Sequence, residues 1–95
     1  MEKLILSEQD IVNAICVYTS RKEQVQPEEV EVDLIYDDET GFTAEASIHK
    51  RMQVFETPNI IEALRLWLDE YVNQDPFSGI KLEFDEDAGI IAHVG

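Results

Sequence analysis

The chain has 95 residues and a formal net charge of −14, because 21 Asp and Glu outnumber 7 Lys and Arg. This length fits a single domain, residues 1–95, and the acidity disfavours direct contact with nucleic acid or anionic membranes, so any charged partner is expected to be basic. No apolar run approaches the roughly 20 residues of a membrane span, and the first segment turns polar too early for a signal peptide, which predicts a cytoplasmic protein.

The first predicted element is a helix over residues 7–24. Ser7 is a suitable N-cap with Asp10 three residues later, the pattern of a capping box, and Pro27 prevents the helix from continuing. The apolar residues at helical spacing, which form its expected buried face, are Ile11, Ala14, Ile15 and Tyr18.

A β-hairpin follows this helix. Residues 28–37 alternate between apolar and mostly polar side chains, as a strand with one buried face does, and the alternation resumes after Gly41. The turn is predicted as type I, with Asp38 in its first position and Gly41 in the left-handed conformation, which would pair Tyr36 with Ala44. The apolar set of the hairpin is Val30, Val32, Leu34, Tyr36, Phe42, Ala44, Ala46 and Ile48.

A second helix and a second hairpin complete the chain. Residues 57–74 are predicted to be helical, with Thr57 as N-cap and Pro58 at the first helical position, which tolerates proline. Residues 80–94 alternate again around the turn EDAG. The expected core face of the helix is Ile60, Leu64, Trp67 and Tyr71, flanked by Ile61 and Leu68, and that of the hairpin is Ile80, Leu82, Phe84, Ile90, Ala92 and Val94.

The two parts of the chain, about 7–50 and 57–95, resemble each other. Their helices align at an offset of 49 residues and their hairpins at an offset of 48, which brings YDDETGF onto FDEDAGI. The shared order, type and offset favour an internal duplication, although two unrelated helix-hairpin units share some of this pattern for physical reasons. The predicted fold is α+β, an α-β-β-α-β-β duplication with a four-stranded, mainly antiparallel sheet and both helices on one face.

Two features leave alternatives open. Residues 1–6 and 52–56 precede their helices at matching positions, and each is either a short edge strand or a plain lead-in segment. Val17 and Leu66 lie at matching positions on the outer shoulders of the helices, away from the face expected to contact the sheet. They indicate either that the two helices touch or that a partner chain covers them.

Acidic residues crowd both predicted turns. A calcium loop needs alternating ligands over about twelve residues and a final bidentate Glu, and neither turn has that pattern. We therefore favour solvated turns over a specific calcium site; their acidity either serves solubility alone or forms an electrostatic patch for a basic partner. The patch comprises Asp37, Asp38, Glu39, Asp85, Glu86 and Asp87.

The polar face of the predicted sheet is the second candidate site. The predicted register sets Glu31 opposite His49, and Glu83 opposite His93. A carboxylate beside an imidazole is a general-base pair, and two such pairs offer ligands for Zn²⁺ or Mn²⁺. Opposite charges across strands are also ordinary on a solvated sheet face, so a purely structural interpretation stands beside this one.

Other reactive or aromatic side chains are interpreted as structural. Cys16 lies in the middle of a helix without a base placed beside it, so we expect a packed thiol, and as a single cysteine it forms no intrachain disulfide. Trp67 and Tyr71 are expected to pack in the core. The sequence has no glycine-rich phosphate loop, paired-cysteine zinc spacing or serine-nucleophile elbow, so we expect no cofactor and name no catalytic residue.

Three segments together resemble the YxcD-like family of small acidic proteins from spore-forming bacteria. The resemblance covers nearly the whole chain, and its segments are MEKLILSEQDIVNAICVY, YDDETGF and IEALRLWLDEY. It implies a bacterial cytoplasmic protein and supplies no activity or catalytic residue to transfer.

The sequence therefore predicts a non-enzymatic module that associates with itself, as a homodimer, or with a basic surface of another protein. Val17 and Leu66 would supply apolar contacts, and the acidic turns would supply charge. The alternative is a divalent-metal or hydrolytic site built on Glu31, His49, Glu83 and His93.

Overall fold

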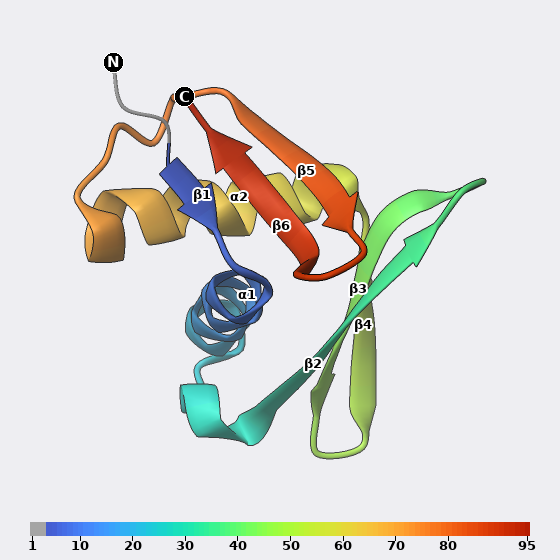
Figure 1. The fold of residues 1–95 in the computed structure, drawn as a ribbon. Helices are drawn as coiled ribbons and strands as arrows, with labels where there is room; N and C mark the ends of the chain where they lie inside the picture. Colours follow the sequence, from blue (N-terminus) through green and yellow to red (C-terminus); the bar gives the residue numbers. More distant parts are fainter. Residues whose placement is uncertain (1–3) are drawn as a thin grey trace.

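The structure is a computed structural model and describes residues 4–95. Within these residues the chain forms two helices, each followed by a β-hairpin and preceded by a short strand (Figure 1). The elements are β1 (Leu4–Leu6), α1 (Glu8–Glu23), the 3-10 turn η1 (Pro27–Glu29), β2 (Val30–Asp37), β3 (Gly41–Ile48), β4 (Arg51–Phe55), α2 (Thr57–Trp67), the π-helical turn η2 (Leu68–Val72), β5 (Ile80–Asp85) and β6 (Gly89–Val94).

The strands form two three-stranded antiparallel sheets, in the orders β1-β6-β5 and β2-β3-β4. The α+β class is confirmed, but the prediction of one four-stranded sheet with both helices on one face is wrong. Both hairpins gain a third strand, because the segments before the helices are strands rather than plain lead-ins. We call residues 4–48 the first half and residues 51–94 the second half. The leading strand of each half pairs with the hairpin of the other half. Each of the two sheets therefore contains strands of both halves.

The start of α1 follows the predicted capping pattern. The Ser7 hydroxyl accepts a hydrogen bond from the Asp10 backbone at 3.1 Å, and the Asp10 carboxylate accepts one from the Ser7 backbone at 3.1 Å. These contacts satisfy two amides that the first helical turn cannot pair. The capping box predicted from the sequence is therefore confirmed.

The start of α2 differs from the prediction. Glu56, rather than Thr57, is the N-cap, and the Asn59 side chain accepts a hydrogen bond from the Glu56 backbone at 3.1 Å. Thr57 lies inside the helix, where its hydroxyl donates to the carbonyl of Phe42 at 2.8 Å. Its side chain thus fastens the helix to β3 instead of capping it.

The buried face of α2 is also displaced from the predicted one. Leu68 is fully buried, whereas Tyr71 is 53% exposed and stacks on the half-buried Trp67 with ring centroids 4.6 Å apart. The prediction that Tyr71 packs in the core is therefore wrong. The helix widens to a π-helical turn at Leu68, and this change of period turns the following side chains away from the face that regular spacing predicts.

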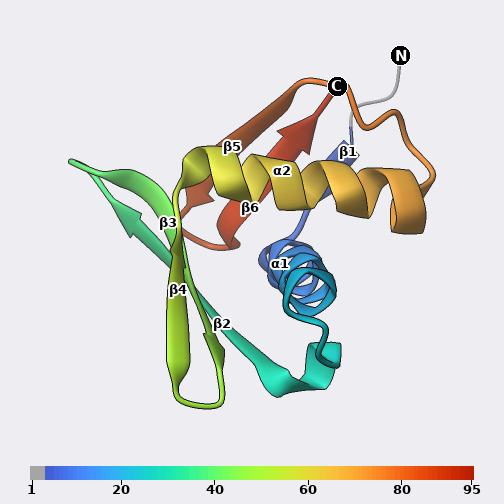
Figure 2. The same cartoon turned by 180° about the vertical axis from the view of Figure 1, so that it is seen from behind.

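One hydrophobic core contains residues of both helices and both sheets. Figures 1 and 2 show α2 in the plane of the view and α1 nearly end-on, so the helices cross steeply, and they contact each other. No helix among the described residues is long and apolar enough to cross a membrane. The fully buried large side chains include Ile11, Ile15, Ile60, Leu64 and Leu68.

The two halves have the same strand pairings at corresponding positions. Leu6 lies opposite Ala92, and Phe55, 49 positions after Leu6, lies opposite Ala44, 48 positions before Ala92. Both helical segments begin and end 49 positions apart, since α1 spans Glu8–Glu23 and α2 with η2 spans 57–72. Descent of the halves from one duplicated unit remains a prediction.

Candidate functional site

The two acidic turns have the same backbone geometry. The Asp37 carboxylate accepts hydrogen bonds from the backbone of Glu39 at 2.7 Å and of Thr40 at 3.4 Å. Asp85 accepts them from Asp87 at 2.8 Å and from Ala88 at 3.0 Å. Asp37 and Asp85 therefore shape the turns with their side chains, which explains an Asp at the start of each acidic run.

The turn begins one residue earlier than predicted. Asp37 is paired with Gly41, and Tyr36 is paired with Phe42 rather than with Ala44. Gly41 and Gly89 both have φ of +82°, the left-handed conformation predicted for them. The pairing is displaced by two positions, an even number, so every residue keeps the face that alternation predicts.

Two aromatic rings stack beside the turns. Tyr36, just before the first acidic run, stacks on Phe84, just before the second, with ring centroids 5.1 Å apart and planes inclined by 12°. Tyr36 is 41% exposed and Phe84 is 48% exposed. Phe42 lies against Tyr36 at 4.9 Å. The last core-facing residue of β2 and that of β5 thus form an aromatic pair open to solvent.

Hydrogen bonding fixes the charge state on both sides of this pair. The Tyr36 hydroxyl donates to the Asp38 carboxylate at 3.0 Å, and this contact raises the pKa of Tyr36, which keeps the ring neutral. The backbone amides of Ala88 and Asp87 lower the pKa of Asp85, which keeps its carboxylate charged. A neutral aromatic surface therefore lies beside negative charge.

The carboxylates of the turns have no cation within residues 4–95. The four ion pairs of these residues join Arg21 to Glu70, Arg51 to Glu23, and the two histidines to glutamates elsewhere. The uncompensated set is Asp37, Asp38, Glu39, Asp85, Glu86 and Asp87. Neighbouring carboxylates repel each other, so a cation bound at this surface would be stabilised.

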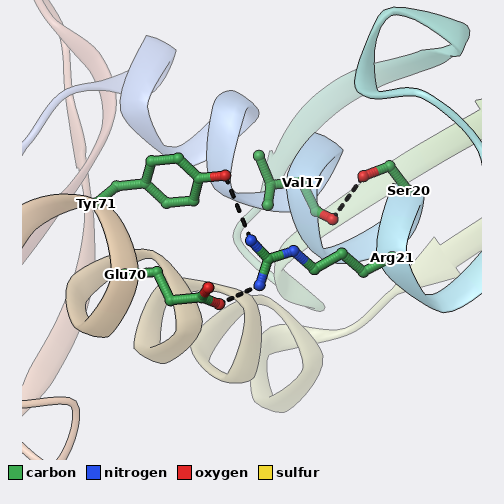
Figure 3. A network of polar contacts seen from close by, with 5 residues as sticks. All are labelled: Val17, Ser20, Arg21, Glu70 and Tyr71. Carbon is green, nitrogen blue, oxygen red and sulfur yellow. Dashed lines mark hydrogen bonds and ion pairs between the residues drawn. The ribbon is translucent and has the colours of Figure 1, made fainter.

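Val17 and Leu66 are half-buried on helices that contact each other. The helices do touch, which is one of the two alternatives that these residues raised. Figure 3 shows Arg21 of α1 directed at Glu70, with which it forms an ion pair, and at the hydroxyl of Tyr71. Both acceptors belong to η2, which follows α2, and Arg21 lies in the last turn of α1. Polar side chains therefore join the C-terminal ends of the two helices.

The histidine pairs predicted on the sheet face are only partly brought together. Glu83 Oε2 and His93 Nε2 lie 2.8 Å apart, although they are diagonal neighbours rather than directly opposite residues. Glu31 lies opposite Ser47, and His49 contacts Glu29 at 3.4 Å instead. The predicted register for Glu31 and His49 is wrong because the first turn begins one residue earlier than expected.

The two histidines belong to different parts of the fold. His49 follows β3, and His93 lies on β6 of the other sheet, so they do not form one cluster. Residues 4–95 contain no group of three or more His, Cys, Asp or Glu side chains that could hold one metal ion. The Glu83 and His93 pair lines an open depression of about 490 Å³ together with Lys81 and the chain end at Gly95.

Cys16 has the environment of a structural thiol. Its Sγ lies 3.7 Å from the carbonyl oxygen of Val30, and partial burial raises the pKa of the thiol. A raised pKa leaves little thiolate near neutrality. The interpretation of Cys16 as packing rather than as a nucleophile agrees with this geometry.

The aromatic pair is the part of the site that sequence reasoning missed. Tyr36 and Phe84 were both assigned to the buried face, where alternation places them. A usable signal was present, since each is the last apolar residue before an acidic run, at the end of a strand. Both residues nevertheless remain more than a third exposed, so the correct face of a strand does not ensure burial at its end.

Comparisons with known proteins place the chain in a family. Residues 1–87 match the family described as "Protein of unknown function (DUF2653)". The chain belongs to the DUF2653 family. It is also 42% identical over 94 residues to "Uncharacterized protein YxcD" of Bacillus subtilis (strain 168), an alignment that covers 97% of this chain and 92% of that protein. The resemblance to YxcD-like proteins is thus confirmed, and no solved structure matches the chain.

Proposed function

We propose that this member of the DUF2653 family is a protein-binding module whose contact surface is formed by the Tyr36 and Phe84 pair and the acidic turns. The observation that carries the proposal is an exposed aromatic stack, followed on both strands by carboxylates that form no ion pair within residues 4–95. Exposed aromatic side chains are frequent at protein interfaces, because they bury a large area at a small entropic cost.

The charge of the chain favours a basic protein as partner. At −14 the molecule repels the phosphates of nucleic acids and anionic lipids. It also repels a second copy of itself. A homodimer through Val17 and Leu66 is the other interaction expected from the sequence, but both side chains are already half-buried in the monomer and offer little free area. We therefore propose a different protein as the partner.

The proposal is tested by the size of the native protein in extracts of the cells that make it. The chain of 10.9 kDa is expected to elute in a larger complex at low salt and to be released as salt is raised. A variant with Asp38→Asn, Glu39→Gln, Glu86→Gln and Asp87→Asn should elute free. It keeps Asp37 and Asp85, which shape the turns.

A matched control removes four charges elsewhere. The substitutions Glu28→Gln, Glu31→Gln, Asp33→Asn and Asp69→Asn change exposed carboxylates that form no ion pair within residues 4–95. The control should elute with the complex, as the wild type does. Elution of the wild type as a free monomer at every salt concentration, with nothing captured by cross-linking, would overturn the proposal.

A second candidate function rests on the 2.8 Å contact between Glu83 and His93. We propose it as a divalent-metal or hydrolytic site, in which the carboxylate orients the imidazole. Zn²⁺ or Mn²⁺ should then raise the thermal unfolding temperature, His93→Ala should abolish the effect, and His49→Ala, a change outside this pair, should leave it in place. Absence of stabilisation of the wild type by any divalent ion would reject this site.

A further inference from the structure

We infer that the partner presents an arginine-rich segment, with one guanidinium group packed on the Tyr36 and Phe84 rings and neighbouring arginines paired with the two acidic turns. The inference rests on the proposed function and specifies the chemistry of its partner. It follows from three features of the surface: the rings are exposed, the carboxylates are unpaired, and their charge is divided between two turns.

The rings offer a surface that attracts a cation. Stacking uses one face of each ring and Phe42 also lies against Tyr36, but Tyr36 remains 41% exposed and Phe84 48% exposed. The face of an aromatic ring carries negative electrostatic potential, so a cation is favoured there. The Tyr36 hydroxyl donates to the Asp38 carboxylate at 3.0 Å, which orients the ring, and the same contact raises the pKa of Tyr36 and so favours its neutral form.

The arrangement of the carboxylates suits several cations rather than one ion. Tyr36 is followed by one acidic run and Phe84 by the other, so negative charge continues from the aromatic pair along both turns. No three carboxylates among the described residues converge as the ligands of a single metal ion would. A peptide segment with repeated positive charges matches such a distribution, because each charge reaches a separate carboxylate.

Arginine fits this surface better than lysine does. Its planar guanidinium stacks on aromatic faces and donates paired hydrogen bonds to a carboxylate at the same time. The ammonium group of lysine is a compact, strongly hydrated charge and gains less from a ring. The aromatic pair therefore predicts a preference between two cations, which the acidic turns alone would not provide.

The experiment measures the binding of synthetic peptides to the full chain by calorimetry at physiological salt. The probes are eight-residue peptides of arginine, of lysine and of glutamate. We expect the arginine peptide to bind about fivefold or more tightly than the lysine peptide, and the glutamate peptide not to bind. Exposed charges further apart than about 8 Å are largely screened under these conditions, so distant carboxylates contribute little.

Two variants separate the contributions of the rings and the charges. Tyr36→Leu with Phe84→Leu keeps an apolar cover over the core but removes the aromatic faces. It should weaken the arginine peptide about fivefold and leave the lysine peptide nearly unchanged. The four-site variant of the acidic turns should weaken both peptides about tenfold, and the four-site control should weaken them less than about threefold. Thermal unfolding of every variant checks that it is folded.

Three results would overturn the inference. If both peptides bind equally and the leucine variant changes neither affinity, the rings take no part. If the control weakens binding as much as the acidic-turn variant, attraction is set by net charge alone. If the wild type dimerises with rising concentration and the leucine variant does not, the occupant is a second copy. A native complex that survives although the arginine peptide fails to bind would retain the proposed function and reject only this partner chemistry.

Discussion

In both halves of the molecule, the first residue of the helix forms a side-chain hydrogen bond to the backbone of a hairpin, but one side chain accepts the bond and the other donates it. Glu8 begins α1, and its carboxylate accepts a hydrogen bond from the Ile90 backbone at 2.9 Å. Thr57 begins α2, and its hydroxyl donates to the Phe42 carbonyl. Glu8 and Thr57 are 49 positions apart, and Phe42 and Ile90 are 48 apart. Each helix is therefore hydrogen-bonded to the hairpin of the other half. The helix side chain is the acceptor in the first case and the donor in the second.

Corresponding positions also contact each other directly. Arg21 pairs with Glu70, 49 positions later, and Tyr36 stacks on Phe84, 48 positions later. The aromatic pair and the helix ion pair thus mark places where the halves meet, and a surface built there draws equally on both.

The largest difference between the halves is expected inside the core, at Thr19 and Leu68. Both are fully buried and lie 49 positions apart, but the Thr19 hydroxyl has no hydrogen-bond partner within the described residues. Leu68→Ala should lower the free energy of unfolding by about 3 kcal/mol through lost burial and a cavity. Thr19→Val should raise it by about 1 kcal/mol, since an unsatisfied polar group is removed. Urea unfolding measures both changes, and a destabilised Thr19→Val variant would contradict the comparison.

The glycines of the two turns provide the next test. Gly41 and Gly89 have the same φ, but a Cβ at Gly89 would lie 2.3 Å from Glu8 Oε2, whereas one at Gly41 meets nothing within 4 Å. Gly41→Ala should cost about 1 kcal/mol from the left-handed conformation alone. Gly89→Ala should cost about 2 kcal/mol, because Glu8 must also move and lose its bond to Ile90.

A double-mutant cycle isolates the contribution of Glu8. In a Glu8→Ala background, Gly89→Ala should cost no more than Gly41→Ala does in the wild type. Unfolding in urea is measured for the wild type, Glu8→Ala, Gly89→Ala, their double variant and Gly41→Ala. An undiminished cost of Gly89→Ala without Glu8 would mean that the two glycines differ for another reason.

A third comparison concerns the loops after the helices. Arg65 Nη1 donates to the carbonyls of Pro76 at 2.6 Å and Ser78 at 3.0 Å. Cys16, 49 positions before Arg65, packs against the core and has one side-chain hydrogen bond within residues 4–95, to the Val30 carbonyl. Arg65→Met should lower the free energy of unfolding by about 1 kcal/mol and speed proteolysis within residues 73–79. Cys16→Ala serves as the control and should leave cleavage of that loop unchanged. Equal cleavage of the arginine variant and the wild type would show that the loop does not depend on Arg65.

Local patterns predicted most of the elements but not how the strands are shared. Alternation and capping correctly placed α1, both hairpins and the glycines of the turns, because these features depend on near neighbours. The pairing of Leu6 with Ala92 joins the two ends of the chain, and no local pattern encodes it. The π-helical turn at Leu68 was missed for a related reason, since tertiary packing decides where a helix departs from its regular period.

The candidate site was predicted in part for similar reasons. The acidic turns are visible in the sequence as charge runs beside glycine, whereas the Tyr36 and Phe84 contact depends on how the two sheets approach each other. The contact of Glu83 with His93 was anticipated, although from an incorrect register, because long side chains also reach diagonal neighbours.

The smallest expected effect concerns the pH response of the second turn, at Asp85. Hydrogen bonds from Ala88 and Asp87 lower the pKa of Asp85 below the ordinary aspartate value of 3.8. Because the folded pKa lies below the unfolded one, the carboxylate stabilises the turn above the unfolded pKa, and this stability is lost as pH falls through the folded pKa. Asp85→Asn should remove this pH dependence.

Amide chemical shifts between about pH 6 and pH 2 provide the measurement. The Ala88 signal should move with a midpoint below 3.8, since its amide bonds the titrating carboxylate at 3.0 Å. In the Asp85→Asn variant the Ala88 signal should stay in place over this range, because the titrating carboxylate is absent. An unchanged Ala88 response in that variant would assign the signal to another group, and a midpoint above 3.8 would mean that the Asp85 carboxylate gains nothing from the turn it shapes.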